Sequence, residues 1–318
     1  MKSFAFVFPG QGSQSVGMLD AWAGHPAVVE TLREASDALD EDIAVLIAAG
    51  PKEALALTTN TQPVMLVAGV AAWRAWLAEG GDKPSVVAGH SLGEYSALVA
   101  AGVLTLAQAA PLVRFRAQAM QQAVPVGVGA MAAVMGMDSD KVRAGCAEAT
   151  RSFGADSHEI VEAVNFNDPL QTVIAGSKAA VDKACEILKA AGAKRALLLP
   201  VSAPFHSSLM RPAAEALREK LASVSFAAPQ IAVLNNIDVT VETDAERIRD
   251  ALVRQAAGPV RWVESVQALK TRGVEAVVEC GPGRILSGMV KRIAPELVTG
   301  VVYDPASLAD TRQLLNTP

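Results

Sequence analysis

Ser91 lies in a sequence pattern that can present a nucleophile. Gly89 and Gly93 flank it in Gly-His-Ser-Leu-Gly, with an apolar β-branched run at 86–88 before the pattern and a small-residue helical stretch at 95–101 after it. This order is the context of a G-x-S-x-G nucleophile elbow, in which glycines let strand and helix approach closely. The serine would then lie at a helix N-terminus, where backbone N–H groups favour a developing oxyanion. A glycine-rich turn capped by a serine would give the same pattern.

His206 is the candidate general base among the four histidines of the sequence. The side chain of His90 should point away from that of its neighbour Ser91, His25 precedes a proline in a turn, and His158 lies in a polar surface stretch. His206 stands in a loop just before a predicted helix, among small residues. Elimination therefore favours His206 as the base, against the alternative of a histidine that caps a helix.

The loop at 9–14, after a predicted buried strand at 4–8, could form a second wall of an oxyanion site. It has little side-chain bulk and several amides, and Gln11 could supply a donor. Loops that leave the C-terminal end of a strand are where α/β sheets place ligands. The loop lacks the G-K-[ST] ending and the G-x-G-x-x-G spacing of phosphate and dinucleotide sites. A plain β-turn is the alternative.

Arg114 and Arg116 lie two residues apart in a predicted apolar helix that runs from a capping box at 105–108 to about 122. At that spacing they cannot share a helix face. One could be solvated while the other points inward, where a buried guanidinium needs an anion. The alternative is that both lie at the surface.

The element pattern predicts an α/β fold with a large α/β-hydrolase-like domain, containing a parallel sheet, and an inserted smaller subdomain. Residues 129–199 predict the ferredoxin-like order βαββαβ, which closes a compact sheet by itself. The large domain would comprise 1–128 and 200–318. Within it, the sequence at 61–63 predicts a helix start, and the polar tail from Ala306 is expected to be loosely held.

The amino-acid composition limits the classes of protein to which the chain could belong. The chain has 318 residues, of which 51% are hydrophobic and 4% aromatic, so its core must consist mainly of Ala, Val and Leu. A net charge of −5 without a basic block argues against nucleic acid. The three cysteines are widely spaced and suggest neither a disulfide framework nor a zinc site. We expect no metal or redox cofactor, no membrane span, no signal peptide and a cytoplasmic location.

Six motifs in order resemble the malonyl-CoA:acyl carrier protein transacylases of fatty acid synthesis, over nearly the whole chain. They are Pro9-Gly10-Gln11-Gly12-Ser13-Gln14, Gly89-His90-Ser91-Leu92-Gly93-Glu94, Arg116, Asn165-Phe166-Asn167, Ala203-Pro204-Phe205-His206 and Gln255. The resemblance implies that Ser91 attacks the malonyl thioester and that His206 is its base.

The resemblance also implies the other site residues. Backbone N–H groups of Gln11 and Leu92 would form the oxyanion hole, and Arg116 would bind the malonyl carboxylate. The backbone carbonyl of Gln255 would orient the histidine in place of a buried acid, so that nearby carboxylates such as Glu94 would be structural.

Two residues of the smaller motifs complete the expected substrate site. Asn165 lies at a strand end where polar residues could face a cleft between domains, and the bulk of Phe205 resembles the malonyl-selecting version of its motif in polyketide acyltransferases, where it leaves no room for an α-methyl group.

Malonyl-CoA and acyl carrier protein are the implied partners, and we expect a monomer. Carrier proteins are usually acidic, so the basic residues of the second half are candidates for docking: Lys194, Arg195, Arg211, Arg218 and Lys220. Three alternatives stay open, namely transfer to a polyketide carrier, a serine esterase or thioesterase, and a non-catalytic scaffold that binds a carrier protein.

Overall fold

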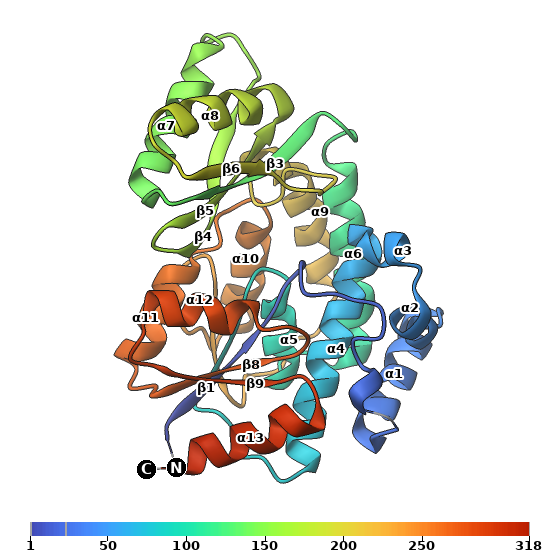
Figure 1. Ribbon diagram of the computed structural model, residues 1–318. Helices are drawn as coiled ribbons and strands as arrows, with labels where there is room; N and C mark the ends of the chain where they lie inside the picture. The colour runs from blue at the N-terminus through green and yellow to red at the C-terminus, as the bar shows by residue number, and fades with distance from the viewer. Residues whose placement is uncertain (1, 23, 318) are drawn as a thin grey trace. The chain divides into compact units, whose positions relative to one another are not determined.

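The computed structural model describes residues 2–22 and 24–317 (Figure 1). The chain divides into two compact units. The first comprises Met1–Ala117, Ser223–Ile248 and Ser265–Pro318, and the second comprises Gln118–Ala222 and Arg249–Glu264. The second unit is thus longer than the subdomain expected at 129–199, because it adds the end of one helix, the segment to Ala222 and a later piece of chain.

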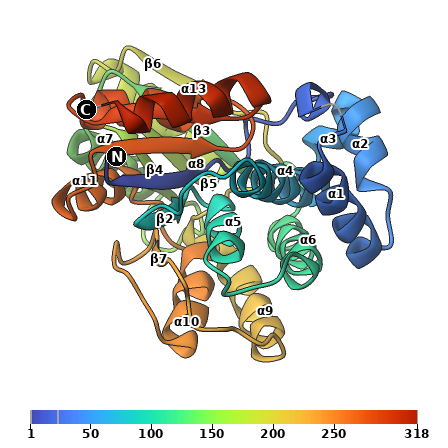
Figure 2. The same ribbon diagram turned by 90° about the horizontal axis from the view of Figure 1, so that it is seen from below.

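A five-stranded parallel sheet forms the core of the first unit, in the order β7, β2, β1, β8, β9. Figure 2 shows α13 alongside β9, and α5 beside β2. The elements in the first unit or extending from it are β1 Phe4–Phe8, η1 Asp20–Trp22, α1 Pro26–Leu39, α2 Ile43–Ala49, α3 Lys52–Ala56, α4 Thr58–Ala78, β2 Val86–Gly89, α5 Gly93–Ala100, α6 Leu106–Gln122, β7 Ala232–Leu234, α10 Ala245–Ala256, α11 Trp262–Thr271, β8 Ala276–Cys280, α12 Ile285–Ile293, β9 Val298–Val302 and α13 Pro305–Asn316.

The register of this sheet aligns the two loops that the sequence singled out. β1 pairs with β2 in parallel, and their last residues, Phe8 and Gly89, are partners. All five residues of β1 and all four of β2 are buried, as near-continuous apolar strands of a covered parallel sheet should be. The loop after β1 and the turn after β2 therefore leave the same edge of the sheet at the same level.

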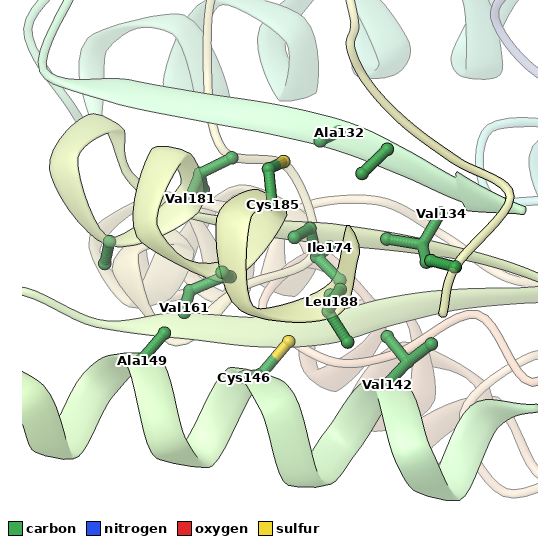
Figure 3. Packing of buried hydrophobic residues seen from close by; sticks show 14 of the residues in the cluster. Ala132, Val134, Val142, Cys146, Ala149, Val161, Ile174, Val181, Cys185 and Leu188 are labelled. Atoms are coloured by element: carbon green, nitrogen blue, oxygen red, sulfur yellow. The ribbon is translucent and has the colours of Figure 1, made fainter. Parts of the chain in front are cut away.

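A four-stranded antiparallel sheet lies in the second unit, in the order β4, β5, β3, β6. The strands and helices of this part occur in the predicted order βαββαβ, and they are β3 Gly129–Met135, α7 Ser139–Ser152, β4 Val161–Asp168, β5 Gln171–Ser177, α8 Lys178–Ala190 and β6 Arg195–Leu198. Two helices follow, η2 Ser208–Met210 and α9 Arg211–Ala222. Figure 3 shows side chains of α7 and α8 packed with those of the strands, among them Val142, Leu188 and Ile174.

Two local predictions were wrong. α4 begins at Thr58 rather than at 61–63, because the N–H groups of Asn60 and Thr61 bond Leu57 O and complete a first turn before Pro63. The tail from Ala306 is ordered as α13, whose Asp304 caps the helix and whose Leu308 and Leu315 are buried. Its exposed polar residues mark the outer face of an amphipathic helix rather than a loose end.

The predicted capping box of α6 is confirmed. Thr105 N donates to Gln108 Oε1 at 2.9 Å, and Gln108 N donates to Thr105 Oγ1 at 3.2 Å. Each side chain thereby satisfies a backbone donor that the start of a helix leaves without a helical acceptor. Among the described residues, no helix is long and apolar enough to cross a bilayer.

Candidate active site

Ser91 occupies a sharp turn that only glycines at both flanks allow. Its own φ is +53°, in the left-handed region that side chains disfavour. A Cβ on Gly89 would lie 1.9 Å from Gly93 C, and a Cβ on Gly93 would lie 2.0 Å from Phe8 O. Both neighbours are backbone atoms that cannot swing aside. The close approach predicted for a nucleophile elbow is therefore confirmed, and β1, β2 and α5 meet at this turn.

Leu92 and the loop after β1 both lie next to the elbow. Leu92 is the N-cap residue of α5, so its N–H has no carbonyl acceptor within that helix. A Cβ on Gly10 would lie 2.6 Å from His90 O, which shows how closely the loop packs against the elbow. Gln11 follows Gly10 directly in this loop. The loop that carries Gln11 thus packs against the elbow, and an oxyanion hole formed by the N–H groups of Gln11 and Leu92 stays a prediction.

The guanidinium of Arg116 lies beside the serine. Arg116 is 2% exposed, its Nη1 donates to Gln62 Oε1 at 2.7 Å, and its Nη2 donates to Ser91 Oγ at 3.4 Å. Arg114, on the other face of α6, instead bonds both carboxylate oxygens of Glu41 at 2.6 and 2.7 Å. The question left open by the sequence is answered, because it is Arg116 that points inward.

The buried surroundings of Arg116 disfavour its charged form. Burial lowers its pKa, while the carboxylate of buried Glu94 favours the charged form. The guanidinium carbon lies 5.6 Å from the centroid of the Tyr95 ring, and burial raises the pKa of Tyr95 to about 12, so that phenol is neutral near pH 7. A carboxylate that entered beside Ser91 would therefore meet a desolvated cation, where ionic hydrogen bonds are strong.

Gln62 connects this cation to the loop after β1, and sequence reasoning missed it. Its Oε1 accepts from Arg116, and its Nε2 lies 3.3 Å from Thr58 Oγ1 and 3.4 Å from Gln11 Oε1. Thr58 also donates to Gln11 Oε1 at 3.0 Å. The signal was present in the sequence, since a glutamine preceding Pro63 in an apolar helix is a buried amide that must find partners.

Asn236 fixes the elbow from the other side and was also missed as a site residue. Its Oδ1 accepts from Ser91 N at 2.7 Å, and its Nδ2 donates to Gly89 O at 2.6 Å. Its backbone N–H donates to Glu94 Oε2 at 2.9 Å. Glu94 therefore binds backbone at the elbow, as expected for a structural carboxylate.

His206, in the second unit, is oriented by backbone carbonyls. Its φ is +66°, its side chain is buried, and its Nδ1 lies 2.9 Å from Gln255 O and 3.2 Å from Gly258 O. A carbonyl only accepts hydrogen bonds, so Nδ1 carries a proton, and in the neutral form of the ring Nε2 is then the acceptor. This is the tautomer that a general base needs, and Gln255 makes the contact that the resemblance implies.

Asn165 lies on β4, and Phe205 lies in the loop that carries His206. Asn165 forms a bridge with Val260, and in the part of the chain that the structure describes its buried Oδ1 has no hydrogen-bond partner. Glu162 accepts from Ser208 N at 2.6 Å, two residues after His206. Phe205 is 7% exposed. β4 thus contacts both segments that hold the histidine, namely the loop before η2 and the segment leading to Val260.

The predicted site residues fall into two groups. Gln11, Ser91, Leu92 and Arg116 come together in the first unit, whereas Asn165, Phe205, His206 and Gln255 belong to the second. The approach of His206 to Ser91, and the role of each residue, remain predictions.

The cysteines offer no competing nucleophile. Cys146, Cys185 and Cys280 are buried free thiols. Burial raises the pKa of all three, that of Cys146 to about 12, so thiolate is scarce at neutral pH. Across residues 2–22 and 24–317, no cluster of three or more His, Cys, Asp or Glu could hold a metal ion.

The chain resembles known acyl transferases over nearly its whole length. The acyl transferase domain family matches residues 5–297, which makes the chain a member of that family. The malonyl CoA-acyl carrier protein transacylase of Salmonella typhimurium is 51% identical over 310 residues, covering 97% of this chain and 98% of that protein. The protein of the same name from Escherichia coli is 50% identical over 315 residues, covering 99% and 100%.

Solved structures of proteins with the same activity in their names are also similar to this chain. The acyl-carrier-protein S-malonyltransferase of Burkholderia pseudomallei is 64% identical, with a TM-score of 0.95 over 98% of this chain and 100% of that one. A malonyl-transacylase in complex with a type II polyketide acyl-carrier protein is 50% identical, with a TM-score of 0.94 over 98% and 99%. Within the acyl transferases, the chain belongs to the malonyl CoA-acyl carrier protein transacylases.

Proposed function

We propose that this protein transfers a malonyl group from coenzyme A, through an ester on Ser91, to the phosphopantetheine thiol of acyl carrier protein in fatty acid synthesis. One observation carries the proposal, namely the 3.4 Å separation of Arg116 Nη2 and Ser91 Oγ. A buried guanidinium beside a nucleophile suits an acyl group that has a second, free carboxylate. The names of the relatives support the same substrate.

In the first half reaction, Ser91 Oγ attacks the thioester carbonyl while His206 Nε2 accepts the hydroxyl proton. The tetrahedral oxyanion accepts hydrogen bonds from the backbone N–H groups of Gln11 and Leu92. The C–S bond then breaks, and His206 returns the proton to the leaving thiolate of coenzyme A. A malonyl ester on Ser91 and free coenzyme A result.

The second half reaction reverses these roles. The carrier thiol gives its proton to His206 as its sulfur attacks the ester carbonyl, and Ser91 recovers that proton when the C–O bond breaks. One neutral base therefore serves both directions. The carbonyls of Gln255 and Gly258 hold the ring in place and stabilise the imidazolium that forms in each half reaction.

Three positions would set the choice of acyl group. Arg116 binds the free carboxylate, the Oδ1 of Asn165 offers a buried polar contact, and Phe205 leaves no room for an α-methyl group. A neutral acetyl group brings no carboxylate to Arg116, so acetyl-CoA is a poor substrate. No metal or redox cofactor enters any step.

Docking of the carrier would use exposed Lys194 and Arg195 at the start of β6. Both are candidates because carrier proteins are acidic. The chain would act in the cytoplasm as a monomer, with no nucleic acid or membrane partner, and its buried free thiols fit a reducing compartment. Transfer to a polyketide carrier is a second candidate, because one relative forms a complex with such a carrier.

We also propose the finer fold description. The parallel sheet with its elbow serine supports an α/β-hydrolase-like large domain at 1–128 and 200–318. The βαββαβ order and its sheet order support a ferredoxin-like subdomain at 129–199.

The test is acylation by labelled malonyl-CoA in the absence of carrier. The wild-type protein should retain label, and Ser91→Ala should retain none. Label that left the wild-type protein rapidly as free malonate would favour a thioesterase instead, and a wild-type protein that took up no label would favour a non-catalytic scaffold. Addition of acyl carrier protein to the labelled enzyme should move the label onto the carrier.

A further inference from the structure

We propose that Asn236 is a positioning residue for Ser91, holding the elbow in the strained conformation that makes its hydroxyl reactive. The side-chain amide of Asn236 bridges the turn, since it accepts from Ser91 N at 2.7 Å and donates to Gly89 O at 2.6 Å. Both partners are backbone groups on either side of His90. This inference rests on the proposed role of Ser91 as the acylated residue.

The sheet brings Asn236 to this place. β7 pairs in parallel with β2, with Ala232, Val233 and Leu234 opposite Val86, Val87 and Ala88. The chain beyond β7 therefore leaves the same sheet edge as the elbow. Asn236 is fully buried there, and its backbone N–H donates to Glu94 Oε2 at 2.9 Å. The backbone of Asn236 is thus bound to the side chain of Glu94, and its side chain is buried away from solvent.

The two hydrogen bonds fit the conformation of the turn. A residue other than glycine at φ +53° costs free energy, and such a conformation persists only where its surroundings determine it. The amide of Asn236 binds both the N–H of Ser91 and the carbonyl of Gly89, and so links the end of β2 to the start of the turn. Without it, the turn can relax toward an ordinary φ and rotate Ser91 Oγ.

A second consequence concerns the oxyanion. A backbone N–H donates one strong hydrogen bond, and that of Ser91 is already given to Asn236. Oxyanion stabilisation then falls to the N–H groups of Leu92 and Gln11 alone. Asn236 thus holds the backbone of the elbow in place and does not itself contact the substrate.

Asn235 provides a matched control on the same strand end. It is also an asparagine and buried, but its Oδ1 accepts from Asp238 N at 2.8 Å and its Nδ2 lies 3.4 Å from Thr240 Oγ1. Its side chain therefore stabilises the turn after β7 and makes none of these bonds to the elbow. A purely structural effect of losing a buried amide should appear equally at Asn235 and Asn236.

The experiment compares Asn236→Ala and Asn235→Ala with the wild-type enzyme, measuring kcat, KM for malonyl-CoA and the thermal midpoint. We expect Asn236→Ala to lower kcat by about 10²-fold, the size of effect that misplaced reacting groups produce. Its KM should change by less than about threefold, because Arg116 still binds the carboxylate. Asn235→Ala should keep kcat within about threefold at a similar loss of thermal midpoint.

The conservative variant Asn236→Asp distinguishes a loss of positioning from a loss of folding. In Asn236→Asp, the carboxylate can accept from Ser91 N but cannot donate to Gly89 O, whereas a protonated acid can do both. The ratio of its kcat to that of wild type should therefore rise as the pH is lowered. Two charged neighbours act on this acid, namely Glu94, which favours its protonation, and Arg116 beside Ser91, which opposes it.

Several results would overturn the inference. If Asn236→Ala folded and kept its kcat, or lost no more kcat than Asn235→Ala, the positioning role would be wrong. A ratio for Asn236→Asp that stayed flat with pH would contradict it as well. Failure of wild-type enzyme to become malonylated would instead refute the proposed function, so the two outcomes are distinct.

Discussion

Arg116 Nη2 stands 3.4 Å from Ser91 Oγ, while Nη1 of the same guanidinium donates to Gln62. The cation is therefore fixed at one end by the protein and faces the nucleophile at the other. In the proposed function, a carboxylate bound by Arg116 would lie close to the acyl carbon that Ser91 attacks. We therefore expect selectivity for diacid thioesters.

Arg116→Ala should lose malonyl transfer while gaining relative activity toward acetyl-CoA. Removing one partner of a buried ion pair costs roughly 3 to 5 kcal/mol, so kcat/KM for malonyl-CoA should fall by about 10² to 10³-fold or more. The acetyl reaction should not fall. Parallel assays with both thioesters measure the ratio.

Arg114→Ala is the matched control, because Arg114 lies two residues away and pairs with Glu41. It should leave the ratio of malonyl to acetyl transfer unchanged. If Arg114→Ala altered that ratio and Arg116→Ala did not, the carboxylate site would have been assigned to the wrong arginine.

His206→Ala should reduce kcat by about 10² to 10⁴-fold, the usual contribution of a positioned general base. KM for malonyl-CoA should change little, since the carboxylate contact is independent of the histidine. Stopped-flow measurement of the malonyl-enzyme burst isolates the first half reaction. His158→Ala, at an exposed loop position, should behave as wild type. A normal malonyl-enzyme burst in His206→Ala would show that His206 is not the general base.

Reversing the charges of Lys194 and Arg195 to Glu should raise KM for acyl carrier protein by roughly tenfold, because an acidic partner meets a repulsive surface. The rate of Ser91 malonylation without carrier should stay at the wild-type value. The control is Lys83→Glu, an exposed residue before β2, at the end of the sheet opposite the elbow. Equal effects of both changes on KM would show general charge repulsion rather than docking.

Glu279 predicts a pH effect on stability. It is fully buried, its Oε2 accepts from Ser287 N at 2.8 Å in the first turn of α12, and burial raises its pKa above the ordinary value of 4.5. The folded protein thus holds this proton more tightly than the unfolded chain, so the contribution of Glu279 to stability is present at low pH and declines as pH rises above about 4.5.

Glu279→Gln keeps an acceptor for Ser287 N without the buried charge. We expect its free energy of unfolding, measured by urea denaturation, to rise relative to that of wild type between acid and neutral pH. Glu219→Gln, exposed on α9, should show no such trend. A constant difference between Glu279→Gln and wild type across pH would contradict the raised pKa.

The sequence predicted the structure best where a feature depends only on residues that are close together in the chain. Gly89 and Gly93 are required by backbone contacts below 2.5 Å, and this requirement is visible in sequence as a spaced glycine pair around Ser91. The capping box at Thr105 and Gln108 is equally local. Such features depend on neighbours in the chain and so could be predicted.

The missed residues depend on distant parts of the chain. Asn236 reaches Ser91 from 145 positions away, and Gln62 reaches Arg116 from 54 positions away. Their contacts follow from the strand order of the sheet and from the hydrogen bond between Gln62 of α4 and Arg116 of α6, and periodicity in one sequence does not encode which partners such buried amides find. The choice between Arg114 and Arg116 was open for the same reason, since only packing decides which helix face is buried.

The most direct test of the central claim is intact-protein mass spectrometry after brief exposure to an equimolar mixture of malonyl-CoA, acetyl-CoA and methylmalonyl-CoA, followed by peptide mapping. We predict a single malonyl adduct per chain, on the peptide that contains Ser91, and none on Ser91→Ala. An acetyl adduct in preference to malonyl, or a malonyl adduct on any other residue, would contradict a serine nucleophile paired with a carboxylate-binding Arg116.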